Sequence, residues 1–338
     1  MTVRIAKQPV NLREKLSELE RPIGVKGNEL MRAETAQDAR DLVSAGRKNL
    51  IINGAMQVAQ RGTSFSNPST NQYMIDRWFM GGGASNRVIS QQSATVNGII
   101  SKTMRFDATG TSGFDIYQAI EDYEYLSNKT VTFSCWYRTN INGVVLRHYA
   151  TETRGTFANT GDTWTYFAAT FTLGALVSNP RTNNGTSFGF WTAGGGVTNG
   201  SFFEVTQVQL EVGKNATEFE HRSYGEELAL CQRYYGKIRL ANQEWIYNEG
   251  NISTNKWHWA NVPFSMRANP SVDMTDITTG GSIGGLTGTI SSLTPQSPGD
   301  TPGRISSRLV MSANGGTARY MYHCDAWNSD YIALNAEL

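Results

Sequence analysis

The chain of 338 residues is long enough for two or three domains with a sizeable core. Hydrophobic residues make up 39% of it and charged residues 17%, which indicates a globular protein rich in Gly, Ser, Thr and Asn turns and excludes a disordered one. Thirty basic residues against 29 acidic ones leave a net charge of +1, so a large basic surface for nucleic acid or anionic membranes is excluded. No stretch approaches 18 apolar residues and the N-terminus has no signal-peptide pattern, which predicts no membrane insertion and folding in a cytoplasm.

The first 47 residues differ in composition from the remainder. About a third of them are charged, against about 15% of the other residues. Leu12, Leu16 and Leu19 are spaced to form a narrow apolar stripe on a short helix, and a second short helix is predicted to begin after Thr35. Because isolated helices of this length are marginal in water, residues 1–47 are expected to oligomerise, to pack on their own body or to attach to another protein.

From Asn49 the pattern changes to short, alternating apolar runs bounded by turn residues. About nine such runs in some 170 residues predict one antiparallel β-sandwich. The expected strands are 49–52, 87–90, 102–106, 114–118, 130–138, 143–149, 164–172, 187–191 and 202–211. In the fifth of these, Val131, Phe133, Cys135 and Tyr137 alternate with Thr130, Thr132, Ser134 and Trp136, so one of the two faces is expected to belong to the core.

A helix over residues 224–235 is predicted to follow, with Leu228 and Cys231 on one face. Further strands are expected at 244–248, 257–262, 271–274, 304–311, 317–323 and 331–335, whereas the Gly-, Ser- and Thr-rich residues 280–303 predict an exposed loop or an irregular edge. The sequence therefore predicts a mainly β protein in three parts. These are an N-terminal helical arm (1–47), an antiparallel jelly-roll sandwich (48–221), and a linking helix with a second β domain (222–338).

Motifs for enzyme chemistry are absent from the sequence. It contains no Gly-x-x-x-x-Gly-Lys-Ser/Thr, Gly-x-Ser-x-Gly or His-Glu-x-x-His pattern, so no catalytic residue, no enzyme activity and no cofactor are predicted. Three cysteines far apart and four scattered histidines predict no transition-metal site. Structural calcium, bound by scattered carboxylates and carbonyls, stays open as an alternative.

Tryptophan is the residue type that most suggests a ligand surface. Trp257, Trp259 and Trp327 are candidates for a platform on which sugars stack, in the C-terminal β domain. Packing in the core or between subunits is the alternative, because positions 257 and 259 share one face of a strand.

Several sequence blocks resemble the tail-fibre and related virion proteins of tailed bacteriophages. The blocks are Gly46-Arg-Lys-Asn-Leu-Ile-Ile-Asn-Gly-Ala-Met-Gln-Val-Ala-Gln-Arg-Gly-Thr63, Tyr73-Met-Ile-Asp-Arg-Trp-Phe79, Gln207-Val-Gln-Leu-Glu-Val-Gly213, residues 216–235, residues 262–272 and the terminal Asn335-Ala-Glu-Leu338. The resemblance covers about residues 46–338. It implies that the first β body is similar to a carbohydrate-binding-module jelly roll, and that the blocks are structural rather than catalytic.

The resemblance also implies where such a protein acts. It leads us to expect a structural virion protein, a tail fibre assembled in the cytoplasm of the bacterial host and joined to other tail or capsid proteins through residues 1–47. Virion appendages are usually homotrimers, and the stripe of Leu12, Leu16 and Leu19 suits such an assembly. Recognition of a host surface polysaccharide or receptor is expected in residues 222–338. The alternatives are a capsid decoration or head-fibre protein, and a polysaccharide depolymerase, whose stacked repeats are absent from the sequence.

Overall fold

A computed structural model describes residues 48–338 except for residues 84, 122, 149–151, 176–186, 193–196, 240–245, 248–254, 262–263, 268–270, 274–280, 284–285, 296–303, 314–330 and 338. The chain divides into two units, Met1–Lys48 and Asn49–Leu338, and all described helices and strands belong to the second. The predicted helices of the arm, with Leu12, Leu16 and Leu19, and the predicted strand 317–323 lie outside the described residues.

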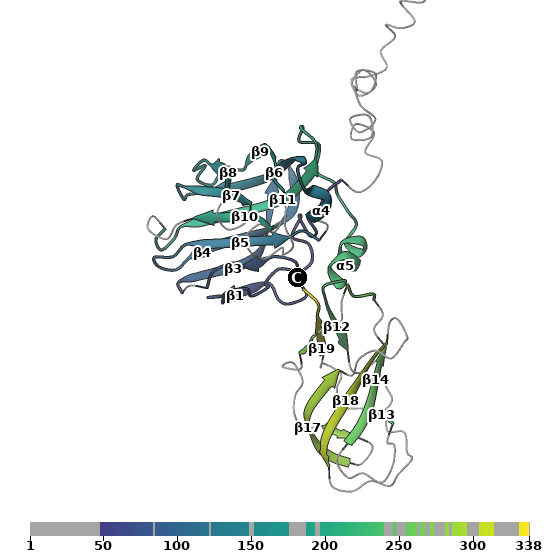
Figure 1. Ribbon diagram of the computed structural model, residues 1–338. Helices are drawn as coiled ribbons and strands as arrows, with labels where there is room; N and C mark the ends of the chain where they lie inside the picture. Colours follow the sequence, from purple (N-terminus) through teal and green to yellow (C-terminus); the bar gives the residue numbers. More distant parts are fainter. Residues whose placement is uncertain are drawn as a thin grey trace, which may run out of the picture. The chain divides into compact units, whose positions relative to one another are not determined.

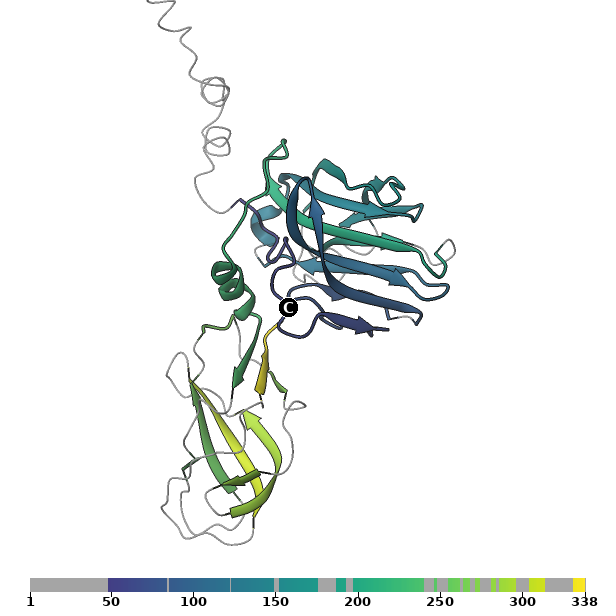
Figure 2. The same cartoon turned by 180° about the vertical axis from the view of Figure 1, so that it is seen from behind.

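Two antiparallel sheets pack face to face as a sandwich between Ser64 and Val212 (Figures 1 and 2). The six-stranded sheet has the order β1 (Ser64–Ser66), β3 (Arg87–Val96), β4 (Ile99–Ala108), β11 (Phe202–Val212), β6 (Thr130–Thr139) and β9 (Thr165–Thr172). The five-stranded sheet has the order β2 (Phe79–Met80), β5 (Phe114–Ala119), β10 (Ser187–Thr192), β7 (Val144–His148) and β8 (Glu152–Phe157). From β4 onward the chain crosses to the other sheet at almost every connection, as in a jelly roll. The predicted mainly β fold is confirmed.

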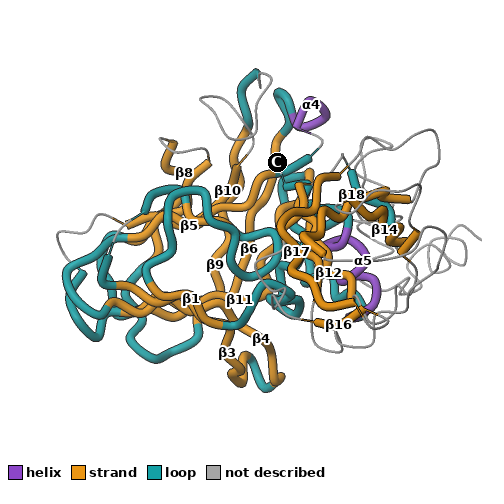
Figure 3. The backbone as a smooth tube through the Cα atoms, turned by 90° about the horizontal axis from the view of Figure 1, so that it is seen from below, coloured by secondary structure: helices purple, strands orange, loops and turns teal. Residues whose placement is uncertain are grey.

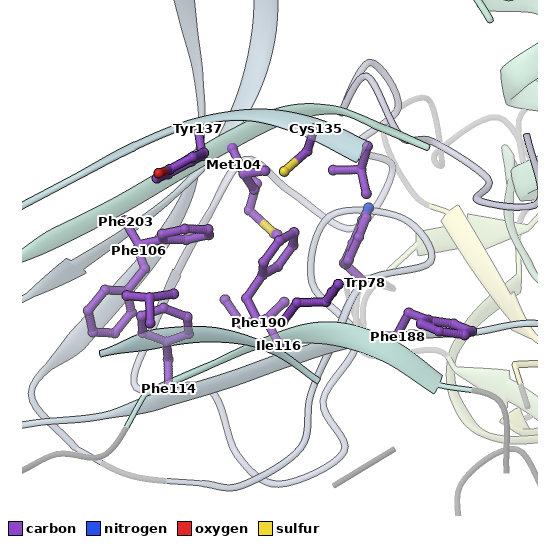
Figure 4. Packing of buried hydrophobic residues seen from close by; sticks show 14 of the residues in the cluster. Trp78, Met104, Phe106, Phe114, Ile116, Cys135, Tyr137, Phe188, Phe190 and Phe203 are labelled. Atoms are coloured by element: carbon purple, nitrogen blue, oxygen red, sulfur yellow. The ribbon is translucent and has the colours of Figure 1, made fainter. Parts of the chain in front are cut away.

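Aromatic side chains fill the space between the two sheets (Figure 4). The ring centroid of Phe190 lies 5.0 Å from that of Phe203 and 6.0 Å from that of Trp78. Strand β6 contributes its alternate residues to this core, as its sequence pattern predicts; they are Val131, Phe133, Cys135 and Tyr137. Burial raises the pKa of the Cys135 thiol, which therefore stays protonated and packs as a small apolar group.

Helix is confined to α4 (Tyr123–Leu126) and α5 (Tyr224–Gln232) in the part of the chain that the structure describes (Figure 3). Helix α5 starts at a capping box, in which the Ser223 hydroxyl accepts from the Glu226 amide and the Glu226 carboxylate accepts from the Ser223 amide. The predicted helix is present but ends at Gln232; its buried residues are Glu227 and Cys231, while Leu228 is half-buried.

Residues 49–52 do not form the predicted strand, and polar side chains explain why. The Asn49 side chain donates to the Val208 carbonyl and accepts from the amides of Ile51 and Leu210, so it replaces the partners that a neighbouring strand would supply. Asn53 stands at φ 58 and accepts from the Val58 amide. The apolar run between them therefore belongs to a turn, here called the Asn49 turn, that docks on β11.

The strands after α5 form two further antiparallel sheets. One has the order β12 (Tyr235–Arg239), β19 (Tyr331–Asn335) and β15 (Ser271–Asp273), and the other has the order β13 (Ile246–Tyr247), β14 (Asn255–Asn261), β18 (Arg304–Ala313), β17 (Leu286–Pro295) and β16 (Gly281–Ile283). Residues 280–303 therefore include two strands, and the prediction of a loop is wrong for them. Strand β17 pairs with β18 although glycines are frequent around it. It contains threonine and isoleucine, which favour strands. The edge position of β16 agrees with the predicted edge.

The end of the chain packs into the sandwich at a cluster that we call the C-terminal joint, which consists of Arg61, Asp76, Arg77, Tyr234 and Glu337. The fully buried Arg77 guanidinium donates to the Glu337 carboxylate and to the Ala119 carbonyl, and it stacks 3.4 Å from the Tyr234 ring centroid. Arg61 lies 3.2 Å from the other Glu337 oxygen and 3.7 Å from Asp76. Burial raises the pKa values of Asp76 and Tyr234.

The sequence blocks that resemble virion proteins meet at this joint and at the Asn49 turn. Arg222 donates to the carbonyls of Asn49 and Ile51, and the buried Glu227 carboxylate accepts from the Asn53 amide at 2.5 Å. These blocks thus hold the beginning and the end of the described chain together.

Candidate functional site

The predicted site residues fall largely outside the described part. Trp257 and Trp259 stand at alternate positions of β14, opposite Arg308 and Ser306 of β18. Their side chains, and the whole of Trp327, lie outside the described residues, as do Leu12, Leu16 and Leu19. The proposed sugar platform and the proposed oligomerisation stripe therefore stay predictions.

A different aromatic pair stands on the outer face of the six-stranded sheet. Trp136 of β6 lies directly opposite Tyr166 of β9, with ring centroids 5.6 Å apart and planes inclined by 58°. Trp136 is half-buried and Tyr166 is 45% exposed. A groove of about 460 Å³ opens beside them, which we call the Trp136 groove. Its volume is in the range of sites for small ligands.

The tip of the β3–β4 hairpin forms part of this groove. Asn97 and Gly98 take φ values of 47° and 79°, as a two-residue hairpin turn requires. The turn leaves Ile99, which lines the groove, 53% exposed. The strands thus present an apolar side chain beside the aromatic pair.

The segment that follows β11 forms another part of the lining with Phe219 and His221, whose rings meet edge to face at 4.9 Å. Buried polar groups of β11 hold this segment in place. The Glu211 carboxylate accepts from the Thr217 amide at 2.8 Å and from the Thr217 hydroxyl at 2.7 Å. Because these bonds are made within the protein, the wall of the groove is formed before any ligand binds.

A β-bulge in β11 turns a polar side chain into the groove. The register with β6 shifts between Thr206 and Gln209, and Gln207 takes φ 52 in the shifted stretch. Gln207 lines the groove, while the Val208 amide next to it donates to the Gly54 carbonyl at 2.9 Å. The bulge therefore serves two contacts at once, one with the Asn49 turn and one with the groove.

A charged cluster lies next to Trp136 on the same sheet, with Arg138 two residues after Trp136 on β6, Arg105 on β4 and Glu204 on β11. The Glu204 carboxylate, 1% exposed, accepts from Arg105 at 3.0 Å, from Arg138 at 2.8 Å and from the Thr103 hydroxyl at 2.6 Å. We call Glu204, Arg105 and Arg138 the Glu204 cluster. The Phe202 ring centroid lies 4.1 Å from the Arg105 guanidinium carbon, so the cluster is packed as well as ion-paired.

Sequence reasoning placed Trp136 on the face of its strand opposite Val131 and Phe133 and assigned it no function. A signal was present, because Trp164 and Tyr166 are two residues apart in the predicted strand 164–172, and such residues share a face. What the sequence alone does not supply is the pairing of β6 with β9, which brings the two sets of aromatic residues together.

Among the described residues, no group of three or more His, Cys, Asp or Glu side chains could bind a metal ion. None of the helices that the structure describes is long and apolar enough to span a membrane.

No protein-family model matches the sequence, and no curated protein matches it. Solved structures with similar arrangements include the enzymatically active domain of tailspike protein 4 from bacteriophage CBA120, with 12% identity over 45% of this chain and 21% of that one, at a TM-score of 0.31. They also include a family 11 carbohydrate-binding module of Clostridium thermocellum, with 12% identity over 46% of this chain and 98% of that one, at a TM-score of 0.27. A family 29 carbohydrate-binding module matches at 8% identity over 44% of this chain and 89% of that one, at a TM-score of 0.26.

The matched part of this chain spans about a fifth of the tailspike structure's length. At such identities and TM-scores the similarities carry no argument about ligand or activity. The sheet topology, the C-terminal joint and the Trp136 groove are therefore the grounds on which a function can be proposed.

Proposed function

We propose that the protein is a structural appendage of a tailed-phage virion that binds saccharides of the bacterial surface through the Trp136 groove. The observation that carries the binding function is the half-buried Trp136 paired with the exposed Tyr166 beside a preformed groove. Aromatic faces offer apolar surface to the C–H groups of a pyranose, and Gln207 and Ser134 in the same lining supply hydrogen-bonding groups for its hydroxyls.

The virion location rests on the resemblance of the sequence blocks. They form the Asn49 turn and the C-terminal joint, so they characterise the architecture of the body rather than its ligand. Residues 1–47 would attach the protein to other tail or capsid proteins, and a homotrimer would present three grooves. Several weak sites on one particle give useful avidity without a tight single site.

We expect the groove to bind without cleaving. Hydrolysis of a glycosidic bond ordinarily uses two carboxyl groups that flank the bond. Glu218 is the one carboxylate among the described residues that line the groove. A capsid decoration or head-fibre protein is the second candidate, since it too would need an attachment arm and an exposed β body.

Binding of the full-length protein to host cells tests the proposal. The variants Trp136→Ala and Tyr166→Ala should weaken binding at least tenfold, with an unchanged melting temperature. The control is Tyr125→Ala, which removes another exposed tyrosine, 53% accessible and located in α4. If Trp136→Ala and Tyr166→Ala bind host cells as well as Tyr125→Ala and the unchanged protein do, the groove is not the site.

Cryo-electron microscopy of intact particles tests the location. Density at the tail would support the tail-fibre assignment, whereas density at capsid vertices or capsomer centres would favour the head-fibre alternative. New reducing ends after incubation with host polysaccharide would show cleavage and contradict the expectation that the protein has no enzyme activity.

A further inference from the structure

The charges around the Trp136 groove restrict what kind of saccharide it can accept. The described residues of its lining include no lysine or arginine; their ionisable groups are Glu218, Tyr166 and His221. The described lining thus offers an acidic sugar no guanidinium or ammonium group to offset the loss of hydration, which is costly for a carboxylate or phosphate.

The arginines of the Glu204 cluster, on the same face, do not change this balance. Both of their guanidinium groups are bound to one buried carboxylate. Arg105 is also 2.9 Å from Asp107, and Arg138 is 3.7 Å from Asp162. Two cations are thus matched by three carboxylates, so this part of the face offers no excess positive charge to an anionic ligand.

The aromatic surface continues beyond the Trp136–Tyr166 pair. Arg138 follows Trp136 by two residues on β6, and Trp164 stands directly before the first residue of β9, two residues before Tyr166. The Arg138 guanidinium lies 5.1 Å from the Trp164 ring centroid. Two residues advance about 6.6 Å along a strand, so Arg138 and Trp164 extend the surface beyond the Trp136–Tyr166 pair, past the end of β9, further than one sugar ring requires.

We infer that the ligand of the groove is an uncharged saccharide chain that lies along β6 and β9, from the Trp136–Tyr166 pair towards Arg138 and Trp164. This inference rests on the proposed function and names its ligand class. Trp136 and Tyr166 would stack on one sugar, and the half-buried Trp164, held by Arg138, would contact a sugar further along the chain.

Glycan arrays followed by titration test the inference on the full-length protein. The array carries neutral oligosaccharides of two to six residues beside uronic-acid, sialic-acid and phosphorylated counterparts. Binding should select neutral chains, should strengthen from two to at least four residues, and should change less than twofold between low and high salt because no ion pair forms.

Variants of two tryptophans test separately the contacts with the first sugar and with a sugar further along the saccharide chain. Trp136→Ala should abolish binding of every length, whereas Trp164→Ala should weaken binding of the longest chain at least tenfold and of the disaccharide less than threefold. Trp164→Phe should restore most of the loss, because it keeps an aromatic face beside Arg138, and unchanged melting temperatures would exclude a folding defect.

The outcomes distinguish the inference from the proposed function. A preference for acidic glycans, an affinity independent of the length of the saccharide chain, or unchanged glycan binding by Trp164→Ala would overturn the inference while leaving the groove as the site. Absence of binding to any arrayed glycan, with cell binding still lost in Trp136→Ala, would also overturn it. Normal binding by Trp136→Ala to both cells and glycans would overturn the proposed function itself.

Discussion

Substitution of Glu337 by Ala tests the C-terminal joint most directly. Arg77 is fully buried, and the Glu337 carboxylate is its anionic partner in the joint. Removal of this carboxylate leaves the guanidinium with two contacts in the joint, the Ala119 carbonyl and the Tyr234 ring, neither of which carries a negative charge. Loss of one partner of a buried ion pair costs about 3–5 kcal/mol, since the other charge stays buried without compensation.

Urea unfolding followed by tryptophan fluorescence measures this loss, with buried Trp78 as an intrinsic probe of the core. Asp162→Ala is the control, because this carboxylate is 84% exposed and its ion pair should contribute at most about 1 kcal/mol. The double variant Arg77→Met with Glu337→Ala should recover a large part of the loss, because it no longer buries an unpaired charge.

Hydrogen exchange then shows whether the tail alone detaches. In Glu337→Ala the amide of Ala336, which donates to the Tyr234 carbonyl at 2.7 Å, should exchange faster, whereas the amides of β6 should stay protected. A loss below about 1 kcal/mol with unchanged exchange at Ala336 would refute a joint held by a buried ion pair.

Three further predictions concern individual side chains. Burial lowers the pKa of His148 below its ordinary value, so the unfolded chain takes up this proton at a higher pH than the folded chain does. The free energy of unfolding should therefore decrease as the pH drops below about 6.5, by up to about 1.4 kcal/mol per pH unit. Urea unfolding at a series of pH values measures this decrease, and His148→Phe should remove it. Gly54→Ala should destabilise by about 1–3 kcal/mol in the same assay, because the new Cβ would collide with the Val208 carbonyl, and a neutral result would contradict the close docking of the Asn49 turn. Ser223→Ala should cost about 1 kcal/mol through loss of the α5 cap, and thermal unfolding with an unchanged midpoint would argue against that cap.

The sandwich could be predicted because its strands repeat every two residues. The alternation of Val131, Phe133 and Cys135 identifies a core face without any knowledge of partners, and the structure buries all three. The same rule does not hold for Thr132 on the other face. It is also buried, and its hydroxyl donates to the carbonyl of Gly213, the residue directly after β11. Burial of an outer face depends on which distant segment of the chain packs on it, and the alternation of residues within one strand does not encode this.

The groove and the joint could not be predicted for a related reason. Trp136 and Tyr166 are 30 positions apart, and only the β6–β9 register makes them neighbours. From the sequence alone, Glu337 is only part of the block Asn335-Ala-Glu-Leu338 and has no assigned partner. Its burial follows from two arginines that lie far earlier in the chain, Arg77 being 260 positions away.

The C-terminal joint also affects how the protein must fold. Arg77 and Glu337 are 260 positions apart, and the guanidinium is buried only when the last strand has arrived. The strands of the sandwich all precede α5 in the sequence, so during synthesis Arg77 has no carboxylate from Glu337 until the segment after α5 has also been made. Contacts between such distant positions form slowly, because a long loop must close before they contribute. A chain interrupted before Glu337 would therefore contain every strand of the sandwich and still lack the anion that Arg77 binds, so completion of the sandwich in sequence does not complete its charge balance.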